Sequence, residues 1–275
     1  MSAPDAPSPL SGRTIGVTAD RRADAQIKLL EARGATVIHG PVIQTHPTPS
    51  EETLRANTEA LIAEPPEVMV MTTGLGVRTW FSAADDLGLG DALRSSLTET
   101  EFLARGPKAA SAIAAAGFAV SWTAARYDDV ISRLVERGVG DVRVGHQRDG
   151  SAADDLGRRI VDLGADLVEL PVYRWALPDD DAAARALIEA TVAGEVDGLT
   201  FTAKPAVEHL FEIADLMGVT DALVDRLSTT ATAFCVGPVC ATGFDDHPGV
   251  DVAVPERFQL AALVHLVAER LDGTR

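Results

Sequence analysis

The 275-residue chain carries 41 acidic and 24 basic side chains, a formal net charge of −17 that disfavours binding nucleic acid or an anionic membrane through the overall field. Hydrophobic residues make up 46% of the chain, which excludes a disordered protein, and no apolar run approaches the length of a membrane span. The length suits two globular domains.

The start of the chain and its cysteines give an expectation about the compartment. MSAPDAPSPLSG lacks the charged and apolar segments of a signal peptide, and we expect residues 1–11 to form a disordered tail. The only cysteines, Cys235 and Cys240, have neither a CxxC spacing nor a nearby His cluster that would indicate a metal site. So few cysteines predict a reducing, cytoplasmic setting.

Short apolar, β-branched runs alternate with amphipathic helical patterns along the chain. Strands are predicted at 14–18, 36–39, 68–72, 118–122, 142–146, 167–171, 198–202, 232–236 and 250–254. Helices are predicted at 23–33, 51–63, 107–116, 127–137, 152–163, 180–193, 204–217 and 257–271. This alternation predicts an α/β fold with parallel sheets covered on both faces, in which ligands bind beyond the carboxyl ends of the strands.

The chain also repeats itself. VMVMTTGLGVRTWF at 68–81 matches DGLTFTAKPAVEHLF at 197–211, and LARGPKAASAI at 103–113 matches FCVGPVCATGF at 234–244. Thr73 then corresponds to Thr202 and Gly106 to Gly237, so the motifs share an offset of 129 to 131 residues. This unit is too long for a solenoid repeat, and we therefore expect two similar α/β domains from an internal duplication.

The repeated strand-to-helix turns are candidate ligand sites. Glycine lets the backbone approach a ligand closely, and proline is tolerated at the first helical position. The N–H groups at such a helix start can bind a carboxylate or a phosphate. The same turns occur in α/β proteins generally, and their Thr residues more often cap the helix that follows. The residues alone leave both interpretations open.

The order of these motifs resembles the uroporphyrinogen-III synthase family. Its framework is a strand ending in a Thr-Ser turn and then a Gly-x-x-Thr-Ala helix start, each present in both halves. In this sequence the corresponding places are TTGLGVRTWF, ARGPKAASAI, LTFTAKPAVEHLF and CVGPVCATGF, and ELPVYRW at 169–175 is similar to the family's return linker. The resemblance covers residues 12–272.

The resemblance implies a discontinuous domain arrangement. One α/β domain would be built from residues 12–41 plus 175–275, and the other from 46–170. A two-stranded linker, 42–45 and 171–174, would join them. The family uses no cofactor and no metal, and the resemblance suggests a monomer.

The resemblance also implies a reaction. The substrate would be hydroxymethylbilane, a linear tetrapyrrole with multiple carboxylates, which cyclises with loss of water and inversion of ring D in haem biosynthesis. Because the bilane closes spontaneously to the wrong isomer, the protein's work would be to fold the substrate and assist departure of the hydroxyl. No membrane and no direct nucleic-acid partner is implied.

The candidate site residues come from the same motifs. Tyr173, in the return linker, would be the catalytic proton donor, or else a linker residue that packs between domains. Substrate-binding candidates are Arg21, Thr72, Thr73, Gly74, Gly106, Lys108, Gln147, Thr202, Ala203, Lys204, Gly237 and Cys240. Lys108 and Lys204 lie in first helical turns, where the helix dipole disfavours a cation, which hints at an anionic ligand. Arg105 would face the ligand or be a solvated charge.

The sequence departs from the family framework at two positions. Ala109 and Cys240 stand where the family has Thr, so two hydroxyls are missing. One alternative is therefore a catalytically degenerate ligand-sensing module of a transcriptional regulator. A generic nucleotide-binding protein is a further alternative, although no glycine-rich phosphate-binding motif follows a predicted strand.

Overall fold

The computed structural model describes residues 8–47, 50–151 and 155–272, and these divide into two compact units. Unit 1 comprises the described residues up to Gln44 and from Ala176 onward, and unit 2 comprises those within Thr45–Trp175. The chain thus leaves unit 1, completes unit 2 and returns to unit 1. This confirms the α/β class with two parallel sheets.

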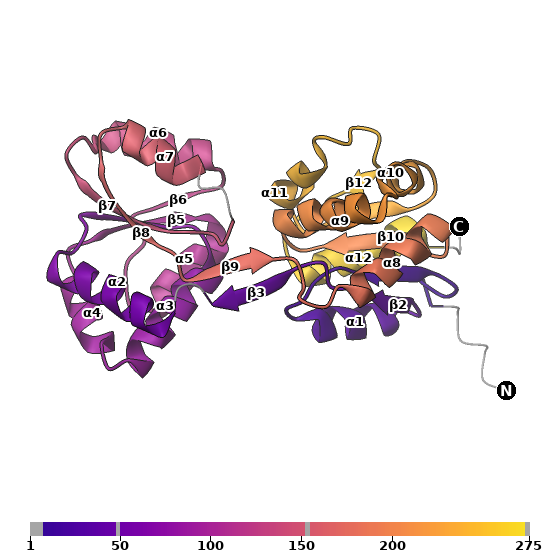
Figure 1. Ribbon diagram of the computed structural model, residues 1–275, viewed down its shortest axis with the longest axis horizontal. Coiled ribbons are helices and arrows are strands. Elements are labelled where there is room, and N and C mark those ends of the chain that lie inside the picture. Colours follow the sequence, from indigo (N-terminus) through magenta and orange to yellow (C-terminus); the bar gives the residue numbers. More distant parts are fainter. Residues whose placement is uncertain (1–7, 48–49, 152–154, 273–275) are drawn as a thin grey trace. The chain divides into compact units, whose positions relative to one another are not determined.

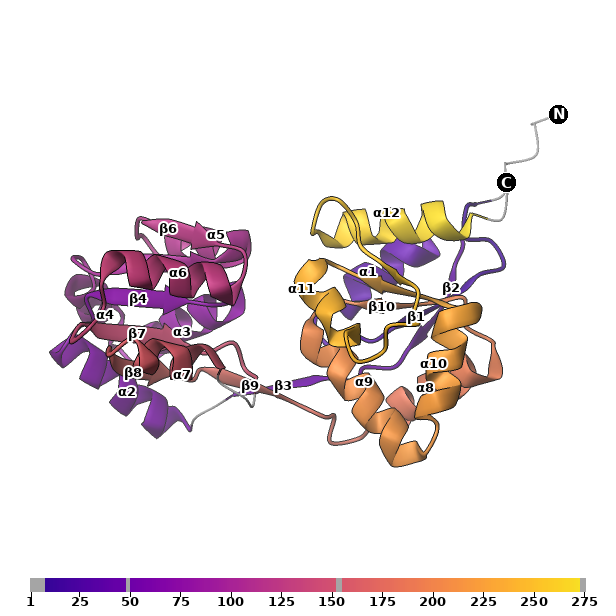
Figure 2. The same cartoon turned by 90° about the horizontal axis from the view of Figure 1, so that it is seen from above.

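Unit 1 contains a five-stranded parallel sheet in the order β12-β11-β10-β1-β2. Its strands are β1 (Thr14–Val17), β2 (Thr36–His39), β10 (Gly198–Phe201), β11 (Thr232–Cys235) and β12 (Val252–Ala253). Its helices are α1 (Ala23–Glu31), α8 (Ala182–Ala193), α9 (Lys204–Met217), α10 (Thr220–Thr229), α11 (Pro238–Ala241) and α12 (Leu260–Leu271). Figure 2 shows α1 and α12 on one face of this sheet and α8, α9 and α10 on the other.

Unit 2 has a sheet of the same design, in the order β6-β5-β4-β7-β8. Its strands are β4 (Val68–Met71), β5 (Glu101–Arg105), β6 (Trp122–Ala124), β7 (Arg143–Gln147) and β8 (Asp166–Leu170). Its helices are α2 (Glu51–Ala63), α3 (Gly74–Asp86), α4 (Gly90–Ser96), α5 (Gly106–Ala115), α6 (Tyr127–Arg137) and α7 (Asp155–Asp162). In Figure 1, α6 and α7 lie on one side of this sheet and α2, α3 and α4 on the other.

Both faces of β4, in the middle of the unit 2 sheet, are buried, which explains why this strand reads as a continuous apolar run. Alternate residues of β4 point to opposite faces because side chains in a strand have a period of two. Met69 and Met71 join the core with Trp80 on α3, whereas Val68 and Val70 join the core with Val130 on α6. The sheet is therefore a central layer between two helical layers.

The identical strand order supports the predicted duplication. The register pairs Val68 with Val144 in unit 2 and Gly198 with Ile15 in unit 1, so β4 and β7 correspond to β10 and β1. The helix caps correct one correspondence. Thr73 caps α3 and Ala203 occupies the cap of α9, so Thr73 corresponds to Ala203 and not to Thr202.

A separate two-stranded sheet forms where the chain passes between the units. It pairs β3 (Gln44–Pro47) with β9 (Tyr173–Ala176). The resemblance predicted linker segments at 42–45 and 171–174, and the two strands lie two residues further along the chain. Neither segment reads as a strand by itself, because QTHP and YRWA contain no apolar run.

Several element predictions were incomplete. β5, α4 and α10 were missed, and the strand predicted at 118–122 lies at Trp122–Ala124. The helix start predicted at the second Gly-Pro pair is α11. Part of the predicted helix 152–163 falls on residues 152–154, outside the described residues, and α7 begins at Asp155 in the described part. Within the predicted tail, Leu10 is buried and its N–H donates to the Arg33 carbonyl at 2.9 Å.

No helix in the part of the chain that the structure describes is long and apolar enough to cross a membrane.

Candidate active site

The carboxyl edge of the unit 2 sheet gathers seven of the predicted site residues. Thr72, Thr73 and Gly74 follow β4, Gly106 and Lys108 follow β5, Gln147 ends β7, and Tyr173 begins β9. Parallel strands end at one edge of a sheet, so motifs that are far apart in sequence come together here.

Tyr173 connects three of these segments through its hydroxyl. The phenol donates to the backbone carbonyl of Asp149 at 2.7 Å and lies 3.0 Å from Oγ1 of Thr73. Because a phenol has one proton, the Thr73 hydroxyl is the donor of the second bond. Thr73 Oγ1 in turn accepts from the N–H of Gly76 at 3.0 Å and so caps α3. Tyr173 is only 3% exposed, and its hydroxyl therefore has a fixed place at the start of α3.

Gln147 and Thr72 are buried and hold the backbone of the turn. The Thr72 hydroxyl donates to the Gln147 carbonyl at 2.6 Å, and Oε1 of Gln147 accepts the N–H of Thr73 at 3.2 Å. Nε2 of Gln147 donates to the carbonyl of Arg148. A Cβ at Gly76 would overlap this amide, which explains the glycine. Both predicted binding residues thus support the turn through bonds within the protein.

A polar cluster lies beside this turn, and of its members sequence reasoning had considered Arg105 as a ligand-facing residue but had assigned no role to Asp149 or Tyr127. The carboxylate of Asp149 accepts the Tyr127 hydroxyl and, at 3.0 Å, the N–H of Ser151. The nearest guanidinium nitrogen of Arg105 lies 4.0 Å from it. Arg105 also donates through Nε to the Thr72 carbonyl at 3.2 Å, and its guanidinium lies 4.7 Å from the centre of the Tyr127 ring. The one available signal was position, since Arg105 ends β5 and Asp149 follows β7, and both strands end at this edge.

The ionisation of Asp149 reflects these contacts. Burial raises the pKa of its carboxyl, but hydrogen bonds from Ser151 and Tyr127 and the charge of Arg105 outweigh burial, so the pKa lies below its ordinary value. The carboxylate is therefore charged at neutral pH. Arg105 and Asp149 are both mostly buried, with side chains 19% and 15% exposed.

The remaining unit 2 candidates are two glycines with structural roles and one exposed lysine. A Cβ at Gly74 would overlap the carbonyl of Lys108, so this glycine allows α3 to approach α5. Gly106 has a φ of +79°, a left-handed conformation that favours glycine. The Lys108 side chain is exposed.

The carboxyl edge of the unit 1 sheet holds the other six candidates. Arg21 follows β1 and is exposed. Thr202, Ala203 and Lys204 follow β10, and Gly237 and Cys240 follow β11. Lys204 forms an ion pair with Glu208 at 3.2 Å, one helical turn away, which provides an internal explanation for a cation at this helix start. Cys240 is 3% exposed, and Cys235 is fully buried.

The two edges differ in chemistry although they share a fold. Val236 precedes the Gly-Pro pair in unit 1, where Arg105 precedes it in unit 2. Phe258 stands in place of Tyr127, and a Cβ at Gly237 would lie 3.3 Å from its ring. Asp20 corresponds to Asp149 and is exposed. Unit 2 thus has a cluster of arginine, tyrosine and aspartate where unit 1 has valine, phenylalanine and an exposed aspartate.

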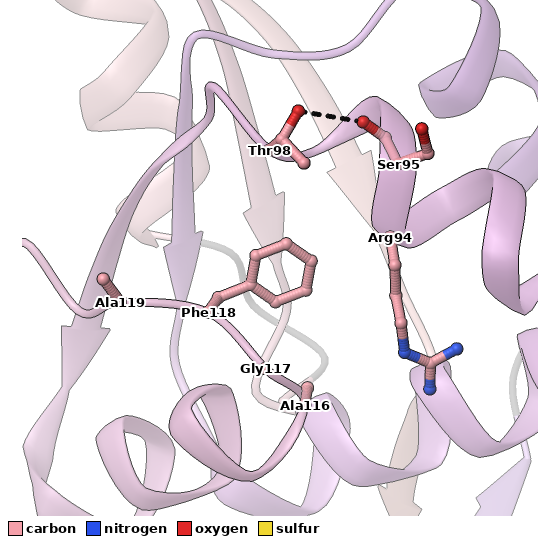
Figure 3. Close-up of a pocket in the computed structure, with 7 residues that line it drawn as sticks. All are labelled: Arg94, Ser95, Thr98, Ala116, Gly117, Phe118 and Ala119. Carbon is pink, nitrogen blue, oxygen red and sulfur yellow. Dashed lines mark hydrogen bonds between the residues drawn. The ribbon is translucent and has the colours of Figure 1, made fainter.

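A hollow in unit 2 lies away from the carboxyl edge of its sheet. A hollow of about 450 Å³ is lined by Arg94, Ser95, Thr98 and residues 116–119. Figure 3 shows Phe118 and Arg94 among its lining residues. These residues precede β5 and β6, so the hollow lies at the amino edge of the sheet, and Arg94 is paired there with Asp85 at 2.6 Å.

Among the residues that the structure describes, no group of three or more His, Cys, Asp or Glu side chains is placed to hold a metal ion.

Comparisons with known proteins match this architecture. The family model described as uroporphyrinogen-III synthase HemD matches residues 24–265. A curated relative from Methanothermobacter thermautotrophicus, named for the same enzyme, is 26% identical over 92% of this chain and 97% of its own length.

Solved structures agree. A crystal structure of a mutant uroporphyrinogen III synthase from the extremely thermophilic bacterium Thermus thermophilus is 29% identical with a TM-score of 0.77, over 94% of this chain and 98% of that one. A uroporphyrinogen-III synthetase from Helicobacter pylori, at 17% identity and a TM-score of 0.53, shares the fold over 94% of this chain and 99% of its own. The family model spans most of this chain, and strand-to-helix turns lie at the carboxyl edges of both sheets. The chain therefore belongs to the uroporphyrinogen-III synthase family of cyclising lyases.

Proposed function

We propose that this family member cyclises hydroxymethylbilane through hydrogen-bonding groups at the carboxyl edges of its two sheets, with Tyr173 as the proton donor. The observation that supports a role for Tyr173 is its hydroxyl, which lies at the start of α3 between Thr73 and the Asp149 carbonyl. The family resemblance supports the substrate, a linear tetrapyrrole with several carboxylates.

The chemical requirement is departure of a hydroxyl from the end of the bilane, followed by attack through ring D. A hydroxide leaves more readily when a proton is delivered to it. Tyr173 holds a proton that it now donates to a carbonyl, and a rotating hydroxyl can give that proton to a substrate oxygen instead. Thr73 donates to the phenol oxygen and would stabilise the negative charge that proton transfer leaves there.

The other predicted residues would hold the substrate. Lys108 and Arg21 are exposed at carboxyl edges, where they are accessible to carboxylates, and Lys204 would exchange its pairing with Glu208 for a substrate group. Thr202 and the backbone at Gly237 would contribute hydrogen bonds. Thr72, Gln147 and Gly74 are buried, which supports a role for them in shaping the turn.

The test is a coupled assay. Hydroxymethylbilane is generated from porphobilinogen in the presence of the protein, the products are oxidised, and uroporphyrins I and III are separated by chromatography. A shift from isomer I to isomer III, absent with heat-denatured protein, is the expected result. Isomer I alone from folded protein would contradict the proposal and favour a module that binds ligand without chemistry.

We further propose a cytoplasmic monomer that needs neither metal nor cofactor. A content of two cysteines in 275 residues suits a reducing compartment. Light scattering after size-exclusion chromatography checks the oligomeric state, and activity after dialysis against a chelator checks the metal.

A further inference from the structure

Arg105 is held in place by three groups of unit 2 at the edge where its strand ends. Its Nε donates to the Thr72 carbonyl, its guanidinium lies over the Tyr127 ring, and Asp149 provides a carboxylate at 4.0 Å. Among the described residues, its second terminal nitrogen, Nη2, has no hydrogen-bond partner. An oriented guanidinium with unused donors suits a ligand carboxylate, which it can bind with two parallel hydrogen bonds.

We propose that Arg105 binds a carboxylate of the tetrapyrrole, and that Asp149 and Tyr127 are positioning residues that hold its guanidinium for this purpose. The proposal rests on the proposed function, because that function supplies the carboxylate ligand. It adds a binding residue that the family motif does not include, since Arg105 precedes the Gly-Pro pair.

The duplicated unit shows that this cluster is not a requirement of the fold. Unit 1 builds the corresponding strand-to-helix turn with Val236 in place of Arg105 and Phe258 in place of Tyr127. Its Asp20, equivalent to Asp149, is left exposed. A mostly buried charge cluster costs desolvation energy. Because the same turn forms without one, its presence in unit 2 points to a ligand.

Asp149 is suited to orient Arg105 without neutralising it. Its carboxylate already accepts from Tyr127 and Ser151, and the separation of 4.0 Å from Arg105 is longer than a direct hydrogen bond. The electrostatic attraction fixes the side chain at this distance while the guanidinium keeps donors for a ligand. We therefore expect the charge of Asp149 to act on ligand binding through Arg105, and this expectation can be tested by removing both residues.

The experiment compares full-length variants by their dissociation constants for uroporphyrinogen III, measured anaerobically by tryptophan fluorescence, and by KM and kcat for hydroxymethylbilane. Arg105→Val copies the duplicated unit, and Arg105→Gln is a second removal that keeps a polar side chain. Loss of one charge-assisted interaction should weaken binding about 10- to 100-fold and raise KM more than it lowers kcat. Arg105→Lys should restore part of the affinity. Arg133→Val, which removes an arginine paired with Glu136 on α6, is the matched control and should match wild type.

The positioning role is tested by a double-mutant cycle. Asp149→Asn alone should weaken binding about 3- to 10-fold, but in the Arg105→Val background it should add less than about 2-fold. Equal losses in both backgrounds would overturn the positioning role. Folded Arg105→Val and Arg105→Gln proteins with unchanged affinity and KM would overturn the carboxylate site.

These outcomes are separable from failure of the proposed function. If wild type binds uroporphyrinogen III but forms no isomer III, and Arg105→Val weakens that binding, the proposed activity is wrong and the Arg105 site stands. If wild type is active and the Arg105 variants behave like it, the site is wrong and the activity stands. If wild type neither binds nor reacts, both are wrong.

Discussion

At the residue scale, the hydroxyl of Tyr173 joins β9, the start of α3 and the loop after β7. Tyr173→Phe removes that oxygen while the ring keeps its packing. We expect the rate of isomer III formation to fall about 100-fold, as for loss of a general acid, and the free energy of unfolding to fall by only about 1 kcal/mol. Isomer separation and urea denaturation measure the two effects, and an unchanged rate would remove Tyr173 from the mechanism.

Gly150 sets the position of the Tyr173 ring. Its φ is +89°, and a Cβ there would overlap the ring. Gly150→Ala should therefore lower the free energy of unfolding by about 2–4 kcal/mol, from backbone strain plus overpacking, and reduce activity as well. Gly88→Ala is the matched control, because Gly88 has a φ of +72° with open space around it. If both variants lose the same stability, the contact with Tyr173 contributes nothing.

The lowered pKa of Asp149 predicts a specific response to acid. A carboxyl whose folded pKa lies below the ordinary 3.8 stabilises the fold above pH 3.8, and this stabilisation is lost as the pH falls through the folded pKa. Relative to wild type, Asp149→Asn should therefore be less stable at pH 6, and the difference should shrink below about pH 4. Urea denaturation at several pH values measures this difference, and a pH-independent gap would contradict the assignment.

At the element scale, the outcome of sequence reasoning depended on how apolar each strand is. β4, β10 and β11 are buried on both faces and were predicted as continuous apolar runs. β5 was missed because EFLAR has a charge at each end, although its repeat partner β11 was predicted, so a strict use of the repeat would have located it. β3 and β9 were implied by the resemblance alone.

The sequence predicted where the candidate site lies, but not which side chains contact one another there. The repeat and the strand-to-helix turns indicated the carboxyl edges, where all predicted site residues lie. Which side chains meet there depends on strand order and loop conformation, and neither is encoded in spacing. The cluster of Arg105, Tyr127 and Asp149 joins residues from three separated segments, so no local pattern announces it.

The helix start after β11 allows a test of the missing hydroxyl. Cys240 is buried in the first turn of α11, where the family framework has Thr. Cys240→Thr exchanges the thiol for a hydroxyl and a methyl group with little change of volume, and we expect isomer III formation to stay within about 2-fold of wild type and the stability to change by less than about 1.5 kcal/mol. A complete loss of activity in a folded variant would show that the thiol has a role of its own.

At the scale of the whole molecule, the two units differ in continuity. Unit 2 is one uninterrupted segment, and it contains the hydrophobic clusters on both faces of its sheet. The sheet of unit 1 needs β1 and β2 from before that segment and β10 to β12 from after it. Residues 45–175 expressed alone should therefore unfold in one cooperative transition, and residues 176–275 alone should not. Circular dichroism melting of both fragments measures this. A cooperative transition in the second fragment would contradict the argument.

The pairing of β3 with β9 determines how unit 2 is inserted into the chain of unit 1. Neighbouring strands lie about 5 Å apart, so the points where the chain leaves and rejoins unit 1 are adjacent. Unit 2 is thus an insertion in the sequence of unit 1, and its two ends are held together by the paired strands β3 and β9. A short turn that joined β3 directly to β9 would replace unit 2, and the same junction would accept a foreign domain whose ends lie equally close together.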